Sequence, residues 1–85
     1  MAFDFEKELL AFNRVIITKL KENQHKSGWK NENAPDLIKR LKEETVELEE
    51  AILTCIPKDI AREAVDVACF AMMIADVCRG LELKN

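Results

Sequence analysis

One apolar segment near the C-terminal end constrains the fold of this chain more than any other. From Ala64 to Cys78 the sequence reads AVDVACFAMMIADVC, without Gly or Pro, and it is apolar on almost every face of a helix. A helix that is hydrophobic all round is normally buried. Asp66 nevertheless lies inside it, one turn after Glu63, so the two carboxylates project from the same side. Because an unpaired buried carboxylate is costly, these acids must be neutralised, ion-paired or bound to a metal.

Length and composition indicate a single small, helix-rich domain that spans residues 1–85. The chain is 48% hydrophobic and 34% charged, with two Gly and two Pro, which is not the composition of a disordered protein. A core of this size is marginal by itself, so the high apolar content favours a core shared between subunits. The net charge of −3 argues against a nucleic-acid polymer as partner. A nucleotide remains compatible with it, because a divalent cation can bridge acids and phosphates.

The cysteines and the hydropathy pattern favour a cytoplasmic protein with no membrane partner. The three Cys residues form no CxxC pair, and we expect reduced thiols that pack as small hydrophobes. Charged residues interrupt any apolar run at the N-terminus, so no signal peptide is expected. The apolar segment has about 15 residues and contains two Asp, which makes it too short and too acidic to span a bilayer.

Apolar periodicity predicts a first helix over residues 4–23, with Asp4 as its N-cap. The apolar stripe of this helix is wider than one partner helix needs, and its members are Phe5, Leu9, Leu10, Phe12, Val15, Ile16, Ile17 and Leu20. We therefore expect the stripe to lie in the core or at a subunit interface.

Two further helices are predicted over residues 35–54 and 58–79. Pro35 and Pro57 suit the first turns of these helices, and Gly80 suits the C-terminal cap of the last one. The short connection between the two helices forces an antiparallel hairpin. The expected fold is all-α: an antiparallel helical hairpin plus the N-terminal helix, which completes a four-helix-type bundle by oligomerisation.

The predicted hairpin brings a second acidic pair level with the first. Glu47 and Glu44 lie about nine and twelve residues before the turn, and Glu63 and Asp66 lie about seven and ten after it. Four facing carboxylates repel one another strongly unless a cation lies between them. A hard divalent ion suits oxygen ligands, so we expect Mg²⁺, with Mn²⁺ as a substitute. Zinc is not expected, because no Cys or His lies beside the acids.

Ion pairs are the alternative explanation of these acids. Arg40 precedes Glu44 by four residues and is placed to pair with it on a helix. Asp66 has Arg62 at the same spacing, or a Lys from another helix, as a partner. Such pairs would compensate the carboxylates without a metal.

The two acidic motifs also resemble those of a known family. Residues 43–47 (EETVE), followed after 15 residues by 63–66 (EAVD), are similar to the EExxE…ExxD signature of the MazG-like all-α nucleoside triphosphate pyrophosphohydrolases, to which the dimeric dUTPases are related. Residues 19–29 (KLKENQHKSGW) and 63–76 resemble segments of the small MazG-like proteins common in bacteriophages. The resemblance covers residues 9–79. Longer members continue with a further helix, and larger relatives carry a second domain.

The resemblance implies hydrolysis of a nucleoside triphosphate, usually a deoxynucleotide, to the monophosphate and pyrophosphate, as in the cleaning of nucleotide pools. Bound Mg²⁺ would neutralise and orient the phosphates and help to generate hydroxide for attack at the α-phosphorus. Active sites of the family commonly involve neighbouring subunits, so a homodimer or homotetramer is expected. The implied metal ligands are Glu44, Glu47, Glu63 and Asp66, and the residues expected to position or deprotonate the water are Glu43 and Glu44.

The only predicted loop offers groups that the acidic cluster lacks. Trp29 is suited to stacking on a base, His25 to a hydrogen bond with base or sugar, and Lys26 or Lys30 to contact with the distal phosphates. Alternatively, Trp29 packs the loop onto the helices and His25 satisfies the end of the first helix. The role of Asp76 is left open by the sequence, between ligand contact and a solvent-facing acid. We therefore treat these four loop residues as candidate substrate contacts.

Three functions are compatible with these observations. The first is Mg²⁺-dependent hydrolysis of (deoxy)nucleoside triphosphates. The second is a non-catalytic helical module that binds nucleotide, or only oligomerises, with its acids in ion pairs. The third is an enzyme that removes a different phosphate grouping.

Overall fold

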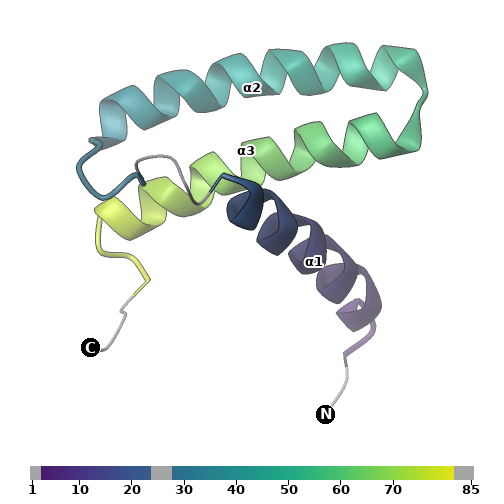
Figure 1. The fold of residues 1–85 in the computed structure, drawn as a ribbon, viewed down its shortest axis with the longest axis horizontal. Coiled ribbons are helices and arrows are strands. Elements are labelled where there is room, and N and C mark those ends of the chain that lie inside the picture. Colours follow the sequence, from purple (N-terminus) through teal and green to yellow (C-terminus); the bar gives the residue numbers. More distant parts are fainter. Residues whose placement is uncertain (1–2, 24–27, 82–85) are drawn as a thin grey trace.

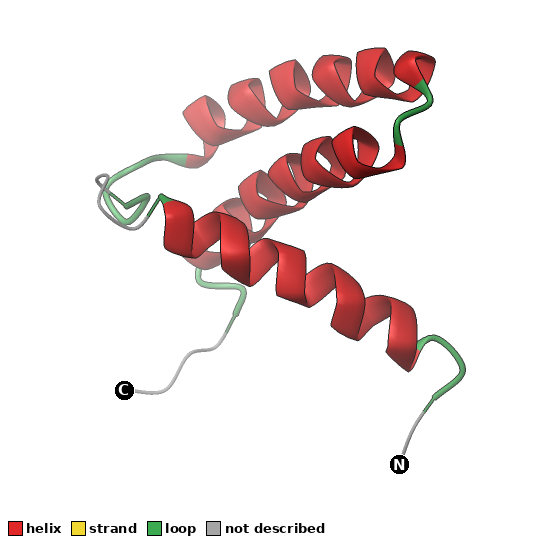
Figure 2. Cartoon of the chain, turned by 45° about the vertical axis from the view of Figure 1, so that its right-hand side comes forward, coloured by secondary structure: helices red, strands yellow, loops and turns green. Residues whose placement is uncertain are grey.

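The computed structural model describes residues 3–23 and 28–81. This part of the chain contains three helices and no strand: α1 (Glu6–Glu22), α2 (Ala34–Thr54) and α3 (Pro57–Val77) (Figures 1 and 2). The all-α prediction is confirmed, and the observed helix bounds differ from the expected ones by two residues or fewer. None of the three helices combines the length and hydropathy needed to cross a bilayer.

Helices α2 and α3 form the antiparallel hairpin, and they run side by side along their whole length (Figure 1). Two residues connect them. Cys55 adopts a left-handed conformation with φ of 58°, and Ile56 is the extended N-cap that leads into α3. The buried side chains of the described residues come from these two helices alone: Leu37, Ala51, Val65, Cys69 and Phe70. The core of the chain is therefore the seam of the hairpin.

Helix α1 packs across α3 and makes no contact of its backbone with that of α2. Its C-terminal half lies on α3, whereas its N-terminal half extends away from the hairpin (Figures 1 and 2). No residue of α1 is buried, and Leu9, Leu10 and Ile17 of its apolar stripe are about half exposed. Phe12, Val15, Ile16 and Leu20 of the same stripe are half-buried. The stripe is thus only partly covered within the chain.

The prediction that Asp4 caps α1 is wrong. The residue at the N-cap is Phe5, and no side chain there accepts a hydrogen bond from the first turn. The N-cap of α2, in contrast, is Asn33, whose Oδ1 accepts a hydrogen bond of 2.9 Å from the backbone N–H of Asp36. Helix α2 therefore begins at a defined cap, and α1 does not.

Helix α3 ends in a Schellman-type turn that is displaced by one residue from the predicted cap. Arg79, rather than Gly80, has the left-handed conformation, with φ of 62°. The backbone N–H groups of Arg79 and Gly80 donate to the carbonyl oxygens of Asp76 and Ala75, at 2.9 and 2.7 Å. A Cβ at Gly80 would lie 3.3 Å from the Ala75 oxygen, so the glycine is explained by this close approach.

Candidate metal and nucleotide site

Three carboxylates from the two hairpin helices meet at the middle of the seam. Glu44 of α2 and Glu63 and Asp66 of α3 each place an oxygen within 4.8 Å of the others. The antiparallel register of the hairpin produces this arrangement, because Glu63 and Asp66 are one turn apart on α3 and Glu44 stands opposite them. We call these three residues the carboxylate cluster.

Two other glutamates named in the sequence analysis lie outside the cluster. Glu47 is exposed and does not bring an oxygen within the same distance of the other three, although its charge is close enough to act on Glu44. Glu43 is exposed as well. The structure therefore gathers three of the four expected ligands and leaves Glu47 at the edge of the cluster.

The cluster carries negative charge that the described residues compensate only in part. Glu44 Oε2 and Glu63 Oε2 are buried, and neither has a hydrogen-bond partner among the described residues. Burial, followed by hydrogen bonding and repulsion from Glu47 and the charges of Asp66 and Glu63, raises the pKa of Glu44 to about 7. Burial and the charge of Asp66 also raise the pKa of Glu63. An oxygen-only set with two unpartnered oxygens fits a hard divalent cation.

Asp66 has a positive partner on the N-terminal helix. Lys19 Nζ lies 3.0 Å from Asp66 Oδ1, and both side chains are about three-quarters buried or more. The sequence offers Arg62 or a Lys from another helix as an ion-pair partner of Asp66, and the structure shows the Lys. Arg40 does not pair with Glu44, since its guanidinium lies over the Phe70 ring, 4.6 Å from the ring centre. This cation–π contact is present in place of the Arg40–Glu44 ion pair that the sequence analysis gave as an alternative.

A cavity of about 620 Å³ opens beside the cluster, between the end of α1, the loop and the hairpin. Its volume lies within the range of small-molecule sites. Carboxylates and apolar or aromatic side chains both contribute to its lining, and we call the part formed by Trp29, Phe70 and Met73 the aromatic wall. The residues that line it are Lys19, Leu20, Asn23, Gly28, Trp29, Glu32, Arg40, Glu44, Asp66, Cys69, Phe70 and Met73.

Trp29 is held in this wall by Asp76. The indole Nε1–H donates to Asp76 Oδ2 at 2.7 Å, and Lys30 Nζ lies 2.6 Å from the same oxygen. These hydrogen bonds, that of Lys30 first, lower the pKa of Asp76, whose side chain is 10% exposed. Asp76 is therefore neither a free surface acid nor a residue that lines the cavity, but the anchor of the loop on α3.

The four predicted loop contacts have different positions. Trp29 both packs onto α3 and lines the cavity, so the two interpretations of this residue are compatible. Lys30 does not line the cavity; its ammonium pairs with Asp76 and lies 5.7 Å from the centre of the Trp29 ring. His25 and Lys26 lie outside the described residues.

Sequence reasoning missed Lys19, Arg40 and Phe70 as members of the site. Phe70 follows Asp66 by four residues, so the helical spacing that pairs Glu63 with Asp66 also places Phe70 next along that face. Phe70 is also a core residue, so the spacing that places it beside the cluster equally predicts its burial. No comparable signal marks Lys19, because its contact depends on how α1 crosses α3.

The fold and the site together define an all-α protein with a cluster of three carboxylates, which could hold a cation, beside a cavity lined in part by aromatic side chains. Residues 9–85 match the family model described as phosphoribosyl-ATP pyrophosphohydrolase, and the chain belongs to this family. The family lies within the superfamily of MazG-like all-α nucleoside triphosphate pyrophosphohydrolases, so the broader resemblance is supported at this level. It is a family of hydrolases that act on an acid anhydride in nucleotide-type substrates. The comparisons with curated proteins and with solved structures gave no match.

Proposed function

We propose that this protein hydrolyses (deoxy)nucleoside triphosphates to the monophosphate and pyrophosphate with the help of Mg²⁺. The observation that carries the proposal is the carboxylate cluster, two of whose members, Glu44 and Asp66, line the 620 Å³ cavity. The family membership supports the reaction class. A cation site and an aromatic wall are the two features that a nucleotide requires, one for its phosphates and one for its base.

Glu44, Glu63 and Asp66 would hold the ion, and Glu47 would extend the ligand set at its exposed edge. Bound Mg²⁺ supplies charge neutralisation for the phosphates and a more acidic water. In the metal-free protein the pKa of Glu44 is raised to about 7, and a bound cation would favour its ionised form, which is the form that can accept a hydrogen bond from the attacking water. Glu43 is exposed and not part of the cluster, so Glu44 is the better candidate of the two for positioning or deprotonating the attacking water.

The aromatic wall of the cavity would receive the base. The Trp29 ring is fixed by its hydrogen bond to Asp76, so stacking on it costs little side-chain entropy. Phe70 and Met73 continue the apolar surface, and Arg40 adds a cation at its border. Stacking on an aromatic ring tolerates every base. This wall therefore supports binding of a nucleotide without specifying which base is preferred.

Phosphoribosyl-ATP is a second candidate substrate, favoured by the description of the family model. It shares with nucleoside triphosphates the anhydride between the α- and β-phosphates, so the same cluster would serve both. The difference lies in the additional ribosyl phosphate on the base, which requires room and positive charge at the base end of the cavity. Arg40 is the described cation that lines the cavity near Phe70.

We further propose that the protein works as a homodimer or homotetramer. Eleven large hydrophobic side chains of the described residues are at least 42% exposed, including Phe5, Leu53 and Ile56. Five of them lie on α1 or just before it and three at the closed end of the hairpin, whereas the buried core holds five residues. A second copy would cover the α1 stripe and complete a four-helix bundle. Light scattering after gel filtration tests this, and a monomer at micromolar concentration would contradict it.

Pyrophosphate release from a substrate panel tests the proposed activity. The panel contains the ribo- and deoxyribonucleoside triphosphates and phosphoribosyl-ATP, each with Mg²⁺ and with EDTA. We expect release with Mg²⁺ only, and loss of turnover in Asp66→Asn, whose amide removes ligand charge at nearly constant shape. Release from phosphoribosyl-ATP alone would assign that compound as substrate. Binding without release from any compound would favour the non-catalytic nucleotide module instead.

A further inference from the structure

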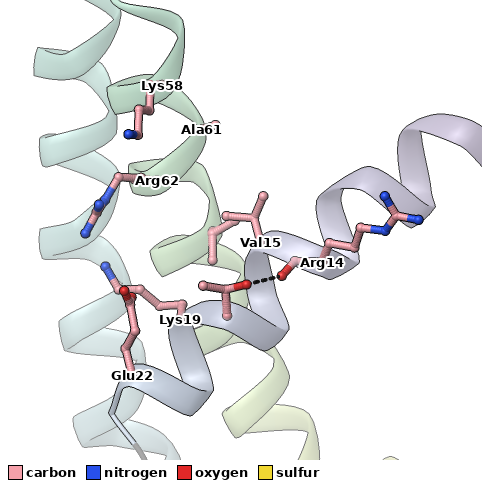
Figure 3. Close-up of a pocket in the computed structure, with 9 residues that line it drawn as sticks. Arg14, Val15, Lys19, Glu22, Lys58, Ala61 and Arg62 are labelled. Carbon is pink, nitrogen blue, oxygen red and sulfur yellow. Dashed lines mark hydrogen bonds between the residues drawn. The ribbon is translucent and has the colours of Figure 1, made fainter.

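A second cavity, of about 300 Å³, lies where α1 crosses the first half of α3 (Figure 3). Its floor is apolar, formed by Val15, Ala61 and Val65. Its rim is charged and carries Lys19 from α1 and Lys58 and Arg62 from α3. None of the roles assigned so far uses this cavity.

The rim concentrates positive charge in a chain whose net charge is −3. Figure 3 shows Lys19, Lys58 and Arg62 on the same side of the cavity, with Glu22 beside Lys19, whereas the Arg14 side chain points away. Among the described residues, Lys58 and Arg62 form no ion pair. Lys58 also lies in the first turn of α3, where the helix dipole disfavours a cation, so local helix stability does not explain its charge.

The cationic rim borders the carboxylate cluster. Lys19 lines both cavities and contacts Asp66, so the two cavities meet at this residue. Arg62 lines a third depression, between α2 and α3, together with Glu47 and Glu63. A polyanion bound at the cluster would therefore meet the cationic rim at Lys19.

Charge balance shows why a polyphosphate would require this rim. The charges of three ionised carboxylates, one divalent cation and the Lys19 ammonium cancel, and Glu47 then leaves the site with a net negative charge. A triphosphate approaching such a site is repelled unless further positive charge lies nearby. Lys58 and Arg62 are cations of the described residues that line the second cavity and not the one with the aromatic wall, and the guanidinium of Arg62 is suited to a forked contact with phosphate.

We propose that Lys58 and Arg62, with Lys19, form the subsite for the β- and γ-phosphates of the substrate and for the pyrophosphate that leaves. This assignment rests on the proposed function. In the reaction the water oxygen bonds to the α-phosphorus, and the bond from that phosphorus to the bridging oxygen breaks. The electron pair stays on the bridging oxygen, which leaves with pyrophosphate, and the protons of water pass to the products and the solvent. Positive charge at this subsite stabilises the negative charge that develops on the leaving group.

Calorimetric titration with inorganic pyrophosphate in the presence of Mg²⁺ tests the subsite without turnover. The test variant is Lys58→Gln/Arg62→Gln, and the control is Lys39→Gln/Lys42→Gln, which removes the same charge from exposed positions on α2. We expect pyrophosphate to bind at least about tenfold more weakly to the test variant, since each lost charge-assisted hydrogen bond costs this much or more. The affinity for a nucleoside monophosphate should change less than twofold in both variants.

The outcomes separate this proposal from the proposed function. Equal pyrophosphate affinity in the wild type and the test variant overturns the subsite, as does a wild type that binds no pyrophosphate. A selective loss of pyrophosphate binding supports the subsite even if the wild type hydrolyses no nucleotide, in which case only the proposed activity fails. Circular dichroism of both variants establishes that they are folded, which the exposure of Lys58 and Arg62 leads us to expect.

Discussion

Lys19 of α1 and Asp66 of α3 form an ion pair, with 3.0 Å between Nζ and Oδ1, at the point where the N-terminal helix crosses the hairpin. The pair has two consequences. It compensates one carboxylate of the cluster, and it attaches α1 to α3 through a polar contact in a crossing that buries no residue of α1. Lys19 therefore both links the two helices and reduces the negative charge of the cluster.

Replacement of Lys19 should destabilise the protein, and Mg²⁺ should offset the loss. Lys19→Met keeps most of the apolar stem but leaves the Asp66 carboxylate, which is 20% exposed, without its partner. We expect a loss of about 1–2 kcal/mol in EDTA, between the values for surface and for buried pairs. Because a cation in the cluster would take over the compensation, added Mg²⁺ should raise the stability of the variant more than that of the wild type.

Urea unfolding with and without Mg²⁺ measures both effects. Lys42→Met, on an exposed position of α2, is the matched control and should change stability by less than about 0.5 kcal/mol. Equal responses of Lys19→Met and the wild type to Mg²⁺ would contradict a cation site at the cluster.

Glu44 should give the stability of the metal-free protein a marked pH dependence. Its pKa is raised from 4.5 to about 7 in the fold, so the folded state binds the proton more tightly than the unfolded state. Proton binding by Glu44 therefore contributes fully to the free energy of unfolding below pH 4.5. This contribution, up to about 3 kcal/mol, is lost as the pH rises through 7. Glu44→Gln should remove most of this decline and be the more stable protein at pH 8 in EDTA.

The affinity for Mg²⁺ should increase with pH, whereas the stability of the metal-free protein should decrease. Protons compete with the cation for Glu44, so Mg²⁺ affinity should increase from pH 6 to pH 8. Titration of the wild type at several pH values measures this increase, and Glu49→Gln, an exposed glutamate of the same helix, is the control for charge alone. A metal-free stability that rises between pH 5 and pH 8 would show that the Glu44 pKa is not raised.

The hairpin could be predicted from the sequence because its determinants are local. Apolar spacing, the two prolines and the short connection define α2 and α3 and set their register, and the register alone brings Glu44 opposite Glu63 and Asp66. The same reasoning included Glu47, which lies one turn from Glu44 but is exposed. Sequence spacing predicts how far along a helix a residue lies. Whether its side chain points toward the neighbouring helix depends on how the two helices pack.

The contacts of α1 and of the loop could not be predicted for a related reason. Lys19 meets Asp66, and Trp29 meets Asp76, across 47 residues of chain in each case. Both contacts depend on the crossing of α1 over α3 and on the path of the loop that follows it. No periodic pattern encodes a crossing angle between helices that meet at few side chains.

The anchor between Trp29 and Asp76 should control the affinity for substrate more than the rate of the reaction. Asp76→Ala removes the acceptor of both the indole N–H and the Lys30 ammonium, so Trp29 should no longer be held in the cavity wall. We expect KM to rise about three- to tenfold, as for the loss of one hydrogen bond, with kcat changed less. Because Trp29 is the single tryptophan, its fluorescence reports the change as a red shift and stronger acrylamide quenching.

Asp76→Asn separates the two contacts of this anchor. The amide retains an oxygen that accepts from the indole but loses the charge that pairs with Lys30, so its KM and quenching should lie between those of the wild type and Asp76→Ala. Glu49→Ala is again a suitable surface control. An unchanged Trp29 emission in Asp76→Ala would refute the anchoring role.

The left-handed conformation of Cys55 makes the hairpin turn a site for stabilisation. A non-glycine residue with φ of 58° is strained, whereas glycine adopts this conformation without a Cβ penalty. Cys55→Gly should raise the free energy of unfolding by about 0.5–1 kcal/mol, after subtraction of the larger entropy that glycine has in the unfolded chain. Cys78, the C-cap of α3, has φ of −88° and gains no such relief, so Cys78→Gly should destabilise by a similar amount. Urea unfolding of the two variants measures the contrast, and a loss of stability in both would show that the turn at Cys55 is not strained.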